Sequence, residues 1–205
     1  MIVDDAATRG GRRDRRHERH EATRQEILAA AWALMRSEGV PSLSLRALAR
    51  VVGMEAQSLY SYFDSKRAIY DALFAEANTE LLARTERYPQ GDDARAALRH
   101  VFHVFVNFCT EDHARYQLLY QRSIPGFEPS EQSYALARQG LDAVRRLLAA
   151  AGYGEEAHLE VSTSVVSGLV AQQMANDPEG ERFVRHLDEV IDMCLDRFEQ
   201  QRRRR

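Results

Sequence analysis

Residues 44–66 read SLRALARVVGMEAQSLYSYFDSK, and this stretch decides the fold of the N-terminal part of the chain. Apolar residues recur at helical spacing from Leu45 to Val52, which predicts a first short helix. Gly53 follows and can adopt the positive φ that a tight turn between two helices needs. A second short helix is expected over about residues 55–63. Two short helices joined in this way are typical of a helix-turn-helix unit, whose second helix enters the major groove of DNA.

The second short helix has a narrow apolar face. Leu59 and Phe63 lie four residues apart and are expected to point inward, whereas the opposite face is polar or amphipathic. Such a face can hydrogen-bond to phosphates and base edges. Its candidate DNA-binding residues are Gln57, Ser58, Tyr60, Ser61 and Tyr62.

The rest of the chain is predicted to be helical as well. Thr23 and Glu26 form a capping-box pattern that predicts a helix start, and Gly39 with Pro41 predicts its end. A longer helix should run from Asp64 or Ser65 to about residue 87, before Pro89 and Gly91. Five more are expected near residues 98–109, 112–121, 131–151, 155–176 and 179–200. With no sustained alternation of a strand, the chain is predicted to be all-α with about nine helices.

Charge is distributed unevenly along the chain. The net charge is −3, with 28 Arg and Lys against 31 Asp and Glu, but residues 1–67 hold 12 basic against 9 acidic side chains. Residues 1–22 are basic and poor in apolar residues, so they are expected to form a flexible arm that either contacts DNA or is simply solvated. We therefore expect a DNA-facing domain over residues 23–67 and a different role for residues 68–205.

Residues 23–73 closely resemble the N-terminal domain of TetR-family transcriptional regulators. The matching elements are Gly39, Leu48–Ala49, Gly53, Leu59–Tyr60, Phe63 and Lys66. The resemblance implies a three-helix helix-turn-helix domain joined to a larger helical domain for ligand binding and dimerisation.

The resemblance also implies roles for single residues on the DNA side. Arg46 aligns with a position that reaches a base or a phosphate, and Tyr60 with a Tyr that contacts phosphate. A half-buried Tyr60 packed on the following helix is the alternative. Lys66, the single Lys of the chain, aligns with a Lys at the start of the next helix. A phosphate held between its ammonium and the first-turn amides would offset the unfavourable placement of a cation at a helix N-terminus.

For the C-terminal domain the resemblance implies a homodimer and a pocket for a small, largely apolar effector. The dimer would bury an apolar stripe on the last two helices; the alternative is that this stripe forms the internal core of a monomer. The residues of the stripe are Val165, Val166, Leu169, Phe183, Leu187, Val190, Ile191 and Cys194. Aromatic and polar residues of the middle helices are candidates for the pocket, although each is individually also a candidate for ordinary core: Phe102, His103, Phe105, Tyr116, Tyr120, Phe127 and Tyr134.

The sequence indicates a binding protein rather than an enzyme, because no catalytic triad, phosphate-binding loop or nucleophile elbow is found. His100, His103 and His113 lack further ligands at metal-binding spacing, so neither a metal nor a cofactor is expected. Cys109 and Cys194 lie on apolar faces and are expected in the core, with a redox role left open. Without a signal peptide or a spanning segment, a cytoplasmic location is expected.

The combined prediction is a repressor that a ligand releases from a palindromic DNA operator. The alternatives are a non-specific or architectural helical DNA-binding protein, or a TetR-like ligand-binding scaffold without specific operator recognition.

Overall fold

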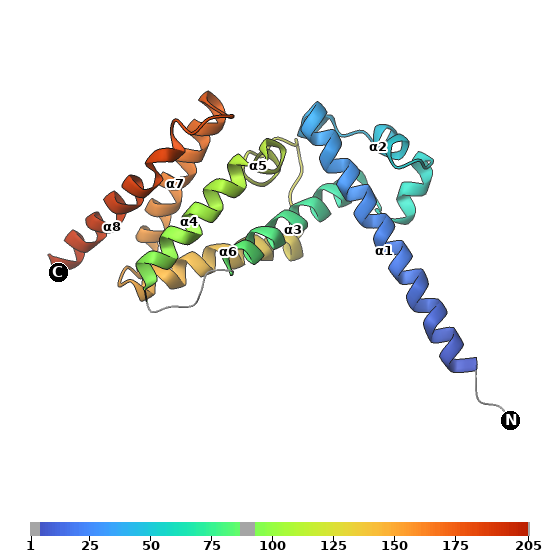
Figure 1. The fold of residues 1–205 in the computed structure, drawn as a ribbon, viewed down its shortest axis with the longest axis horizontal. Helices are drawn as coiled ribbons and strands as arrows, with labels where there is room; N and C mark the ends of the chain where they lie inside the picture. The colour runs from blue at the N-terminus through green and yellow to red at the C-terminus, as the bar shows by residue number, and fades with distance from the viewer. Residues whose placement is uncertain (1–4, 87–92, 205) are drawn as a thin grey trace. The chain divides into compact units, whose positions relative to one another are not determined.

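A computed structural model describes residues 5–86 and 93–204, with side chains from Arg15 onward. Its described residues form eight α-helices and three short 3₁₀ helices and no strand (Figure 1). Counting the longest 3₁₀ helix, η2, with the α-helices gives nine, and the all-α prediction is confirmed. The helices are α1 (Asp5–Glu38), η1 (Val40–Ser42), α2 (Leu45–Val51), η2 (Ala56–Ser61), α3 (Lys66–Thr85), α4 (Ala94–Thr110), α5 (His113–Tyr120), α6 (Glu131–Ala150), α7 (Glu156–Asn176), η3 (Val184–His186) and α8 (Leu187–Arg203).

The chain forms two compact units that divide inside α3. The first holds the residues up to Leu73 together with Ser123–Phe127, and the second holds Phe74–Arg122 and Glu128–Arg205. The sequence prediction placed this boundary at residues 67 and 68. Pro89 and Gly91, which were expected to stop the helix now labelled α3, lie outside the described residues, as do residues 1–4 of the predicted arm.

The first unit is built on α1, which packs against η1 and α2, while α2 packs against η2. Its core includes Ile27, Ala31 and Met35 of α1, which are at most 1% exposed. Gly39 has φ 89° and Gly53 has φ 70°, so the two predicted glycine turns both use the left-handed region. The turn at Gly53 is closed by a hydrogen bond of 2.9 Å from Met54 N to Ala49 O.

The predicted start of α1 at Thr23 is wrong, because the helix already begins at Asp5. Thr23 does not cap it: its Oγ1 donates to Arg19 O, one turn earlier, at 3.1 Å. The upstream residues are mostly Arg, Glu and Ala, which favour helix strongly enough to override a local capping pattern. The segment expected to be a flexible arm is thus helical from Asp5 onward.

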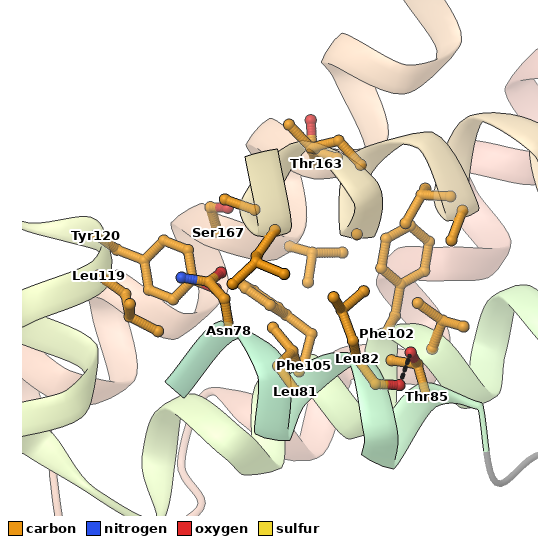
Figure 2. A pocket seen from close by; sticks show the side chains of 18 of the residues that line it. Asn78, Leu81, Leu82, Thr85, Phe102, Phe105, Leu119, Tyr120, Thr163 and Ser167 are labelled. Carbon is orange, nitrogen blue, oxygen red and sulfur yellow. Dashed lines mark hydrogen bonds between the residues drawn. The ribbon is translucent and has the colours of Figure 1, made fainter. Parts of the chain in front are cut away.

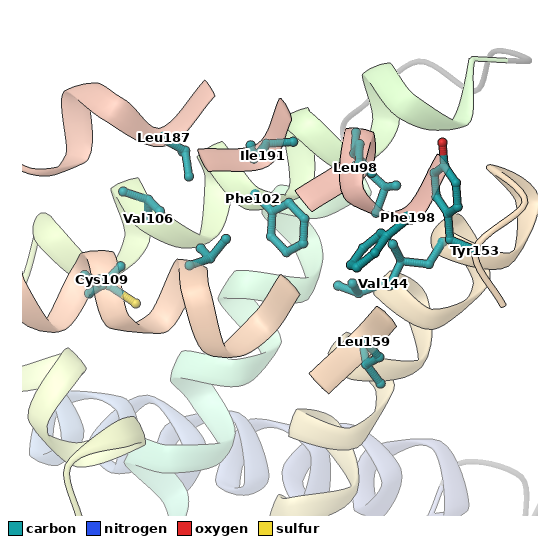
Figure 3. Packing of buried hydrophobic residues seen from close by; sticks show 14 of the residues in the cluster. Leu98, Phe102, Val106, Cys109, Val144, Tyr153, Leu159, Leu187, Ile191 and Phe198 are labelled. Atoms are coloured by element: carbon teal, nitrogen blue, oxygen red, sulfur yellow. The ribbon is translucent and has the colours of Figure 1, made fainter. Parts of the chain in front are cut away.

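The second unit is organised around α4, which packs against α5, α6, α7 and α8. Asp93 caps α4 by accepting hydrogen bonds of 3.0 Å from Arg95 N and Ala96 N. In Figure 3, Leu187, Ile191 and Phe198 of α8 lie with Leu98, Phe102 and Val106 of α4 in one apolar cluster. No described helix has the length and apolar character needed to cross a membrane.

Candidate nucleic-acid interface and ligand cavity

The predicted recognition element is the 3₁₀ helix η2 rather than an α-helix. Leu59 is 1% exposed and Phe63 is 4% exposed, so the apolar pair anchors this element to the first unit as expected. The opposite face is open to solvent, and Tyr60 is 54% exposed. Four of the five residues predicted on this face are exposed: Gln57, Ser58, Tyr60 and Ser61.

Tyr62, the fifth predicted residue, contacts protein instead. It is half-buried, and its ring stacks on the imidazole of His20 with centroids 4.7 Å apart and an interplanar angle of 25°. His20 Nε2 also lies 3.3 Å from the carbonyl oxygen of Ser61. The Tyr62 side chain therefore helps to hold the end of η2 against α1 and is less available for contact with DNA.

Arg24 forms the second contact between α1 and the end of η2. Its Nη1 donates to Tyr62 O at 2.5 Å, and its guanidinium carbon lies 4.2 Å from the centroid of the Phe63 ring. Carbonyl groups at the end of a helix lack intrahelical donors and favour a cation. His20 and Arg24 lie four residues apart on one face of α1 and form what we call the α1 clamp. A helix that began at Thr23 would leave out His20, so the local capping pattern does not predict this clamp.

Two basic residues flank the recognition element. Arg46 is exposed in the first turn of α2. Lys66 is half-buried at the first position of α3, with its Nζ 3.5 Å from Pro41 O and 5.4 Å from the centroid of the Tyr70 ring. An ammonium group has three donors, so contact with one carbonyl leaves capacity for a phosphate.

The second unit contains a cavity of about 360 Å³ between α3, α4, α6 and α7, with the end of α5 (Figure 2). Four of the seven predicted pocket residues line it: Phe102, Phe105, Tyr120 and Tyr134. Apolar cavities of this size with a few polar groups are typical of small-molecule sites.

The other three predicted pocket residues lie elsewhere. His103 is on a different side of α4, with Nε2 2.9 Å from Asp188 Oδ1 on α8. This hydrogen bond is one of the causes, with Arg99, that hold the pKa of Asp188 below its ordinary value. Tyr116 is buried in the apolar cluster of the second unit. Phe127 belongs to the first unit, where its ring centroid lies 5.6 Å from that of Tyr70.

Helix α3 is the part of the cavity wall that the aromatic pattern did not reveal. Asn78, Leu81, Leu82 and Thr85 line it at positions i, i+3, i+4 and i+7, the spacing of one helix face. That spacing was visible in the sequence, but an apolar helix face predicts burial without telling a cavity from a packed core. Helices α6 and α7 supply further residues that were not predicted, among them Leu136, Leu141, Thr163 and Ser167.

The polar groups of the cavity are few and differ in how they are satisfied. Thr85 Oγ1 donates to Leu82 O at 2.7 Å, and Thr163 Oγ1 donates to Leu159 O at 2.7 Å, so both hydroxyl protons are used within their own helices. Asn78 is 5% exposed, and its Nδ2 donates to Phe74 O at 2.8 Å. Burial of the Tyr120 hydroxyl raises its pKa above the ordinary value, although 42% of the residue is exposed.

The residues predicted for a dimer interface separate into two groups. Val166, Leu187 and Ile191 are 2% exposed within the subunit, and Val166 also lines the cavity, so these three are occupied by the subunit's own packing. Val165 is 40% exposed, and the remaining four are half-buried: Leu169, Phe183, Val190 and Cys194. Two exposed apolar residues on the same helices were not predicted: Val161 is 45% exposed and Met193 is 66% exposed.

Comparison with known proteins gives the same assignment for the first unit. Residues 27–73 match the model of the family described as bacterial regulatory proteins, tetR family. The class C tetracycline repressor protein of Escherichia coli is 28% identical over 161 residues, which cover 77% of this chain and 69% of that repressor.

Two solved structures have the same fold. The TetR family transcriptional regulator PfmR from Thermus thermophilus superposes with a TM-score of 0.60 at 20% identity, covering 84% of this chain and 94% of PfmR. A TetR variant from Acinetobacter baumannii AYE, solved in complex with minocycline, gives a TM-score of 0.62 at 24% identity, covering 87% of this chain and 97% of the variant. These matches support the assignment of this chain as a TetR family transcriptional regulator, a DNA-binding class of protein.

Proposed function

We propose that this regulator is a homodimeric repressor that binds a palindromic operator and leaves it when a small molecule fills the cavity of the second unit. The observation that carries the proposal is the continuity of α3. This helix begins at Lys66, the candidate phosphate contact, and contributes Asn78, Leu81, Leu82 and Thr85 to the cavity wall. A ligand that favours one position of α3 can therefore shift the population of DNA-competent molecules.

On the DNA side, the exposed face of η2 is proposed to read the bases, and its flanks to hold the backbone. Gln57 is the candidate for base contact, because an amide can pair with the edge of adenine. Ser58, Tyr60 and Ser61 share its exposed face, and Arg46 and Lys66 supply positive charge for bases or phosphates. Tyr62 receives a positioning role, since its ring is already stacked on His20.

The proposed dimer surface lies on the outer sides of α7 and α8. Val161, Val165 and Met193 expose apolar area there, and half-buried Leu169, Val190 and Cys194 extend it. Two copies of such a surface can pack around a two-fold axis, which would match the symmetry of a palindromic site. Phe183 remains a candidate at the edge of this surface.

Release by a ligand is supported by the cavity itself and by the relatives. One relative is named as a tetracycline repressor, and one structural neighbour was solved with minocycline. The cavity of about 360 Å³ in the second unit provides a place for an effector in this chain.

A footprint on the DNA upstream of the protein's own gene, repeated over a range of salt concentrations, tests the DNA side. We expect one protected palindrome; a salt-dependent affinity without a protected site would identify a non-specific binder instead. Lys66→Ala should weaken binding to all sequences and lower the salt slope by about 0.9, the value for one phosphate contact. Gln57→Ala should relax base preference by about 1–3 kcal/mol with an unchanged slope.

Arg146→Ala is a matched control for the loss of a positive charge. Arg146 is exposed on α6 of the second unit, away from η2 in the sequence and in the other compact unit. Its substitution should leave both the slope and the base preference unchanged. If Lys66→Ala and Gln57→Ala behave like this control, the proposed interface is wrong.

A further inference from the structure

The cavity in the second unit has a distinctive lining that bears on what it binds. Its lining side chains are apolar or neutral: among the described residues around it, none is charged. An ionised group placed inside would therefore lose its hydration without gaining a counter-charge, which is unfavourable. This composition selects for a neutral ligand.

Two polar side chains of the cavity, those of Asn78 and Tyr120, lie near one end of it. Figure 2 shows Asn78 and Tyr120 at one end of the view, and Thr85 with Phe102 at the other. Thr85 directs its hydroxyl proton to a carbonyl of its own helix. Asn78 uses its amide nitrogen in the same way, toward Phe74 O, which leaves the amide oxygen as an acceptor in a residue only 5% exposed. Because Asn78 lines the cavity, a donor of a bound ligand can pair with this oxygen.

The cavity is also long enough to hold the polar end and the apolar body of one ligand in different parts. The four residues of α3 that line it run from Asn78 to Thr85, which corresponds to about 10 Å of helix. Most of the remaining wall is aliphatic or aromatic, including Leu81 and Leu82 from α3 with Phe105 and Val144, while Tyr134, Thr163 and Ser167 add hydroxyl groups. Burial of an apolar body along this wall would supply most of the binding free energy.

We propose that the cavity binds a neutral amphiphile whose hydroxyl or amide donor meets Asn78 Oδ1 beside Tyr120, and whose aliphatic body lies along α3 toward Phe102. This inference rests on the proposed ligand role of the cavity and adds the chemical class and the orientation of the ligand. Raised by burial, the pKa of Tyr120 keeps its hydroxyl protonated, so that it can donate to the oxygen of the same head group.

Three probes of equal chain length test the charge selectivity: decanol, decanoate and decylammonium, each titrated calorimetrically into the full-length protein below its micelle concentration. Decanol should bind at least about 100-fold more tightly than either ionised probe, which corresponds to the cost of burying an unpaired charge. Equal binding of decanol and decanoate would overturn the proposal.

Two substitutions at Asn78 test the orientation. Asn78→Leu keeps the size of the side chain and should weaken decanol about threefold to tenfold, the effect of losing one hydrogen bond. Asn78→Asp introduces a negative charge and should reverse the preference between decanol and decylammonium. Thr79→Ala is the matched control, because Thr79 is the next residue of α3, is exposed and does not line the cavity. Unchanged decanol affinity in Asn78→Leu, as in the control, would overturn the assigned orientation.

The proposal and the repressor function can fail separately. Ligand binding is measured here without DNA, and release is measured by repeating the footprint with each probe. If decanol binds selectively but leaves the footprint intact, the ligand class stands and ligand-driven release is wrong. If the ionised probes bind as tightly as decanol, the ligand class is wrong whatever happens to the footprint.

Discussion

Replacing Arg24 by Met should disturb both the stability of the first unit and the placement of η2. Arg24 donates to Tyr62 O at 2.5 Å and lies 4.2 Å from the Phe63 ring centroid. A hydrogen bond from a charged donor contributes about 1.5–3 kcal/mol, and a partly exposed cation–π contact adds about 0.5–1 kcal/mol. The 3.6 Å ion pair with Glu21 joins side chains that are 31% and 50% exposed, so solvent screening leaves it little weight. Because Met retains the apolar stem, we expect a net loss of about 2–4 kcal/mol.

Urea denaturation followed by the fluorescence of Trp32 measures this loss. Trp32 is the only Trp of the chain and is 6% exposed in the first unit, so its emission reports the unfolding of that unit. Gln25→Met is the control: the neighbouring side chain is exposed, and its replacement should change the free energy of unfolding by less than about 0.5 kcal/mol.

DNA binding separates a positioning role of Arg24 from a phosphate contact. Arg24 uses its guanidinium within the protein, so Arg24→Met should lower operator affinity without changing the salt slope. A slope reduced by about 0.9 would mean that Arg24 neutralises a phosphate. That result, or an unfolding free energy equal to that of Gln25→Met, would refute the reasoning about the α1 clamp.

Three further predictions concern other parts of the molecule. Tyr70→Phe removes the buried hydrogen bond of 2.9 Å to Val40 O and should destabilise the first unit by about 1–3 kcal/mol in the same urea assay. Burial raises the pKa of Tyr70 from 10.0 to about 12. The contribution of the protonated Tyr70 hydroxyl to the stability of the first unit is therefore complete below pH 10 and is lost as the pH rises through about 12. Over this interval Tyr70→Phe should lose less stability than the unsubstituted protein. Val165→Arg should shift the protein to monomer in analytical ultracentrifugation, whereas Gln139→Arg, at an exposed position of α6, should not. Gly140→Ala should stabilise α6 by about 0.5–1 kcal/mol in thermal denaturation, since its Cβ would meet Leu82 Cδ2 at an ordinary 3.9 Å; a lower melting temperature would show that the helix cannot accept it.

The sequence was sufficient for the helix-turn-helix unit because its signals are local. Gly53 marks the turn, and the spacing of Leu59 and Phe63 identifies which face of η2 is buried. The position of Tyr62 depends on His20, which lies 42 residues earlier in the chain and in a segment expected to be flexible. No local pattern contains that contact, so the side chain was assigned to the DNA surface.

The last helix shows a different limit. An apolar stripe on α8 predicts that this face is buried, but it does not say whether the partner is the same chain or a second copy. Leu187 and Ile191 turn inward to α4, while Met193 turns outward. The cavity has a similar ambiguity, because Tyr116 and Tyr120 have equivalent patterns in the sequence and only the second lines it.

The shared helix α3 has a consequence for how this regulator can change over time. Lys66 and the cavity residues from Asn78 onward lie on one helix, but Lys66 does not line the cavity. Under the proposed function, a substitution at Asn78 can therefore alter which compound is sensed while the proposed DNA-facing surface keeps its sequence. In the other direction, η2 can acquire a new target site without a change in the cavity wall. The proposed ligand specificity and the proposed DNA specificity can thus change independently, while α3 continues to connect the two parts.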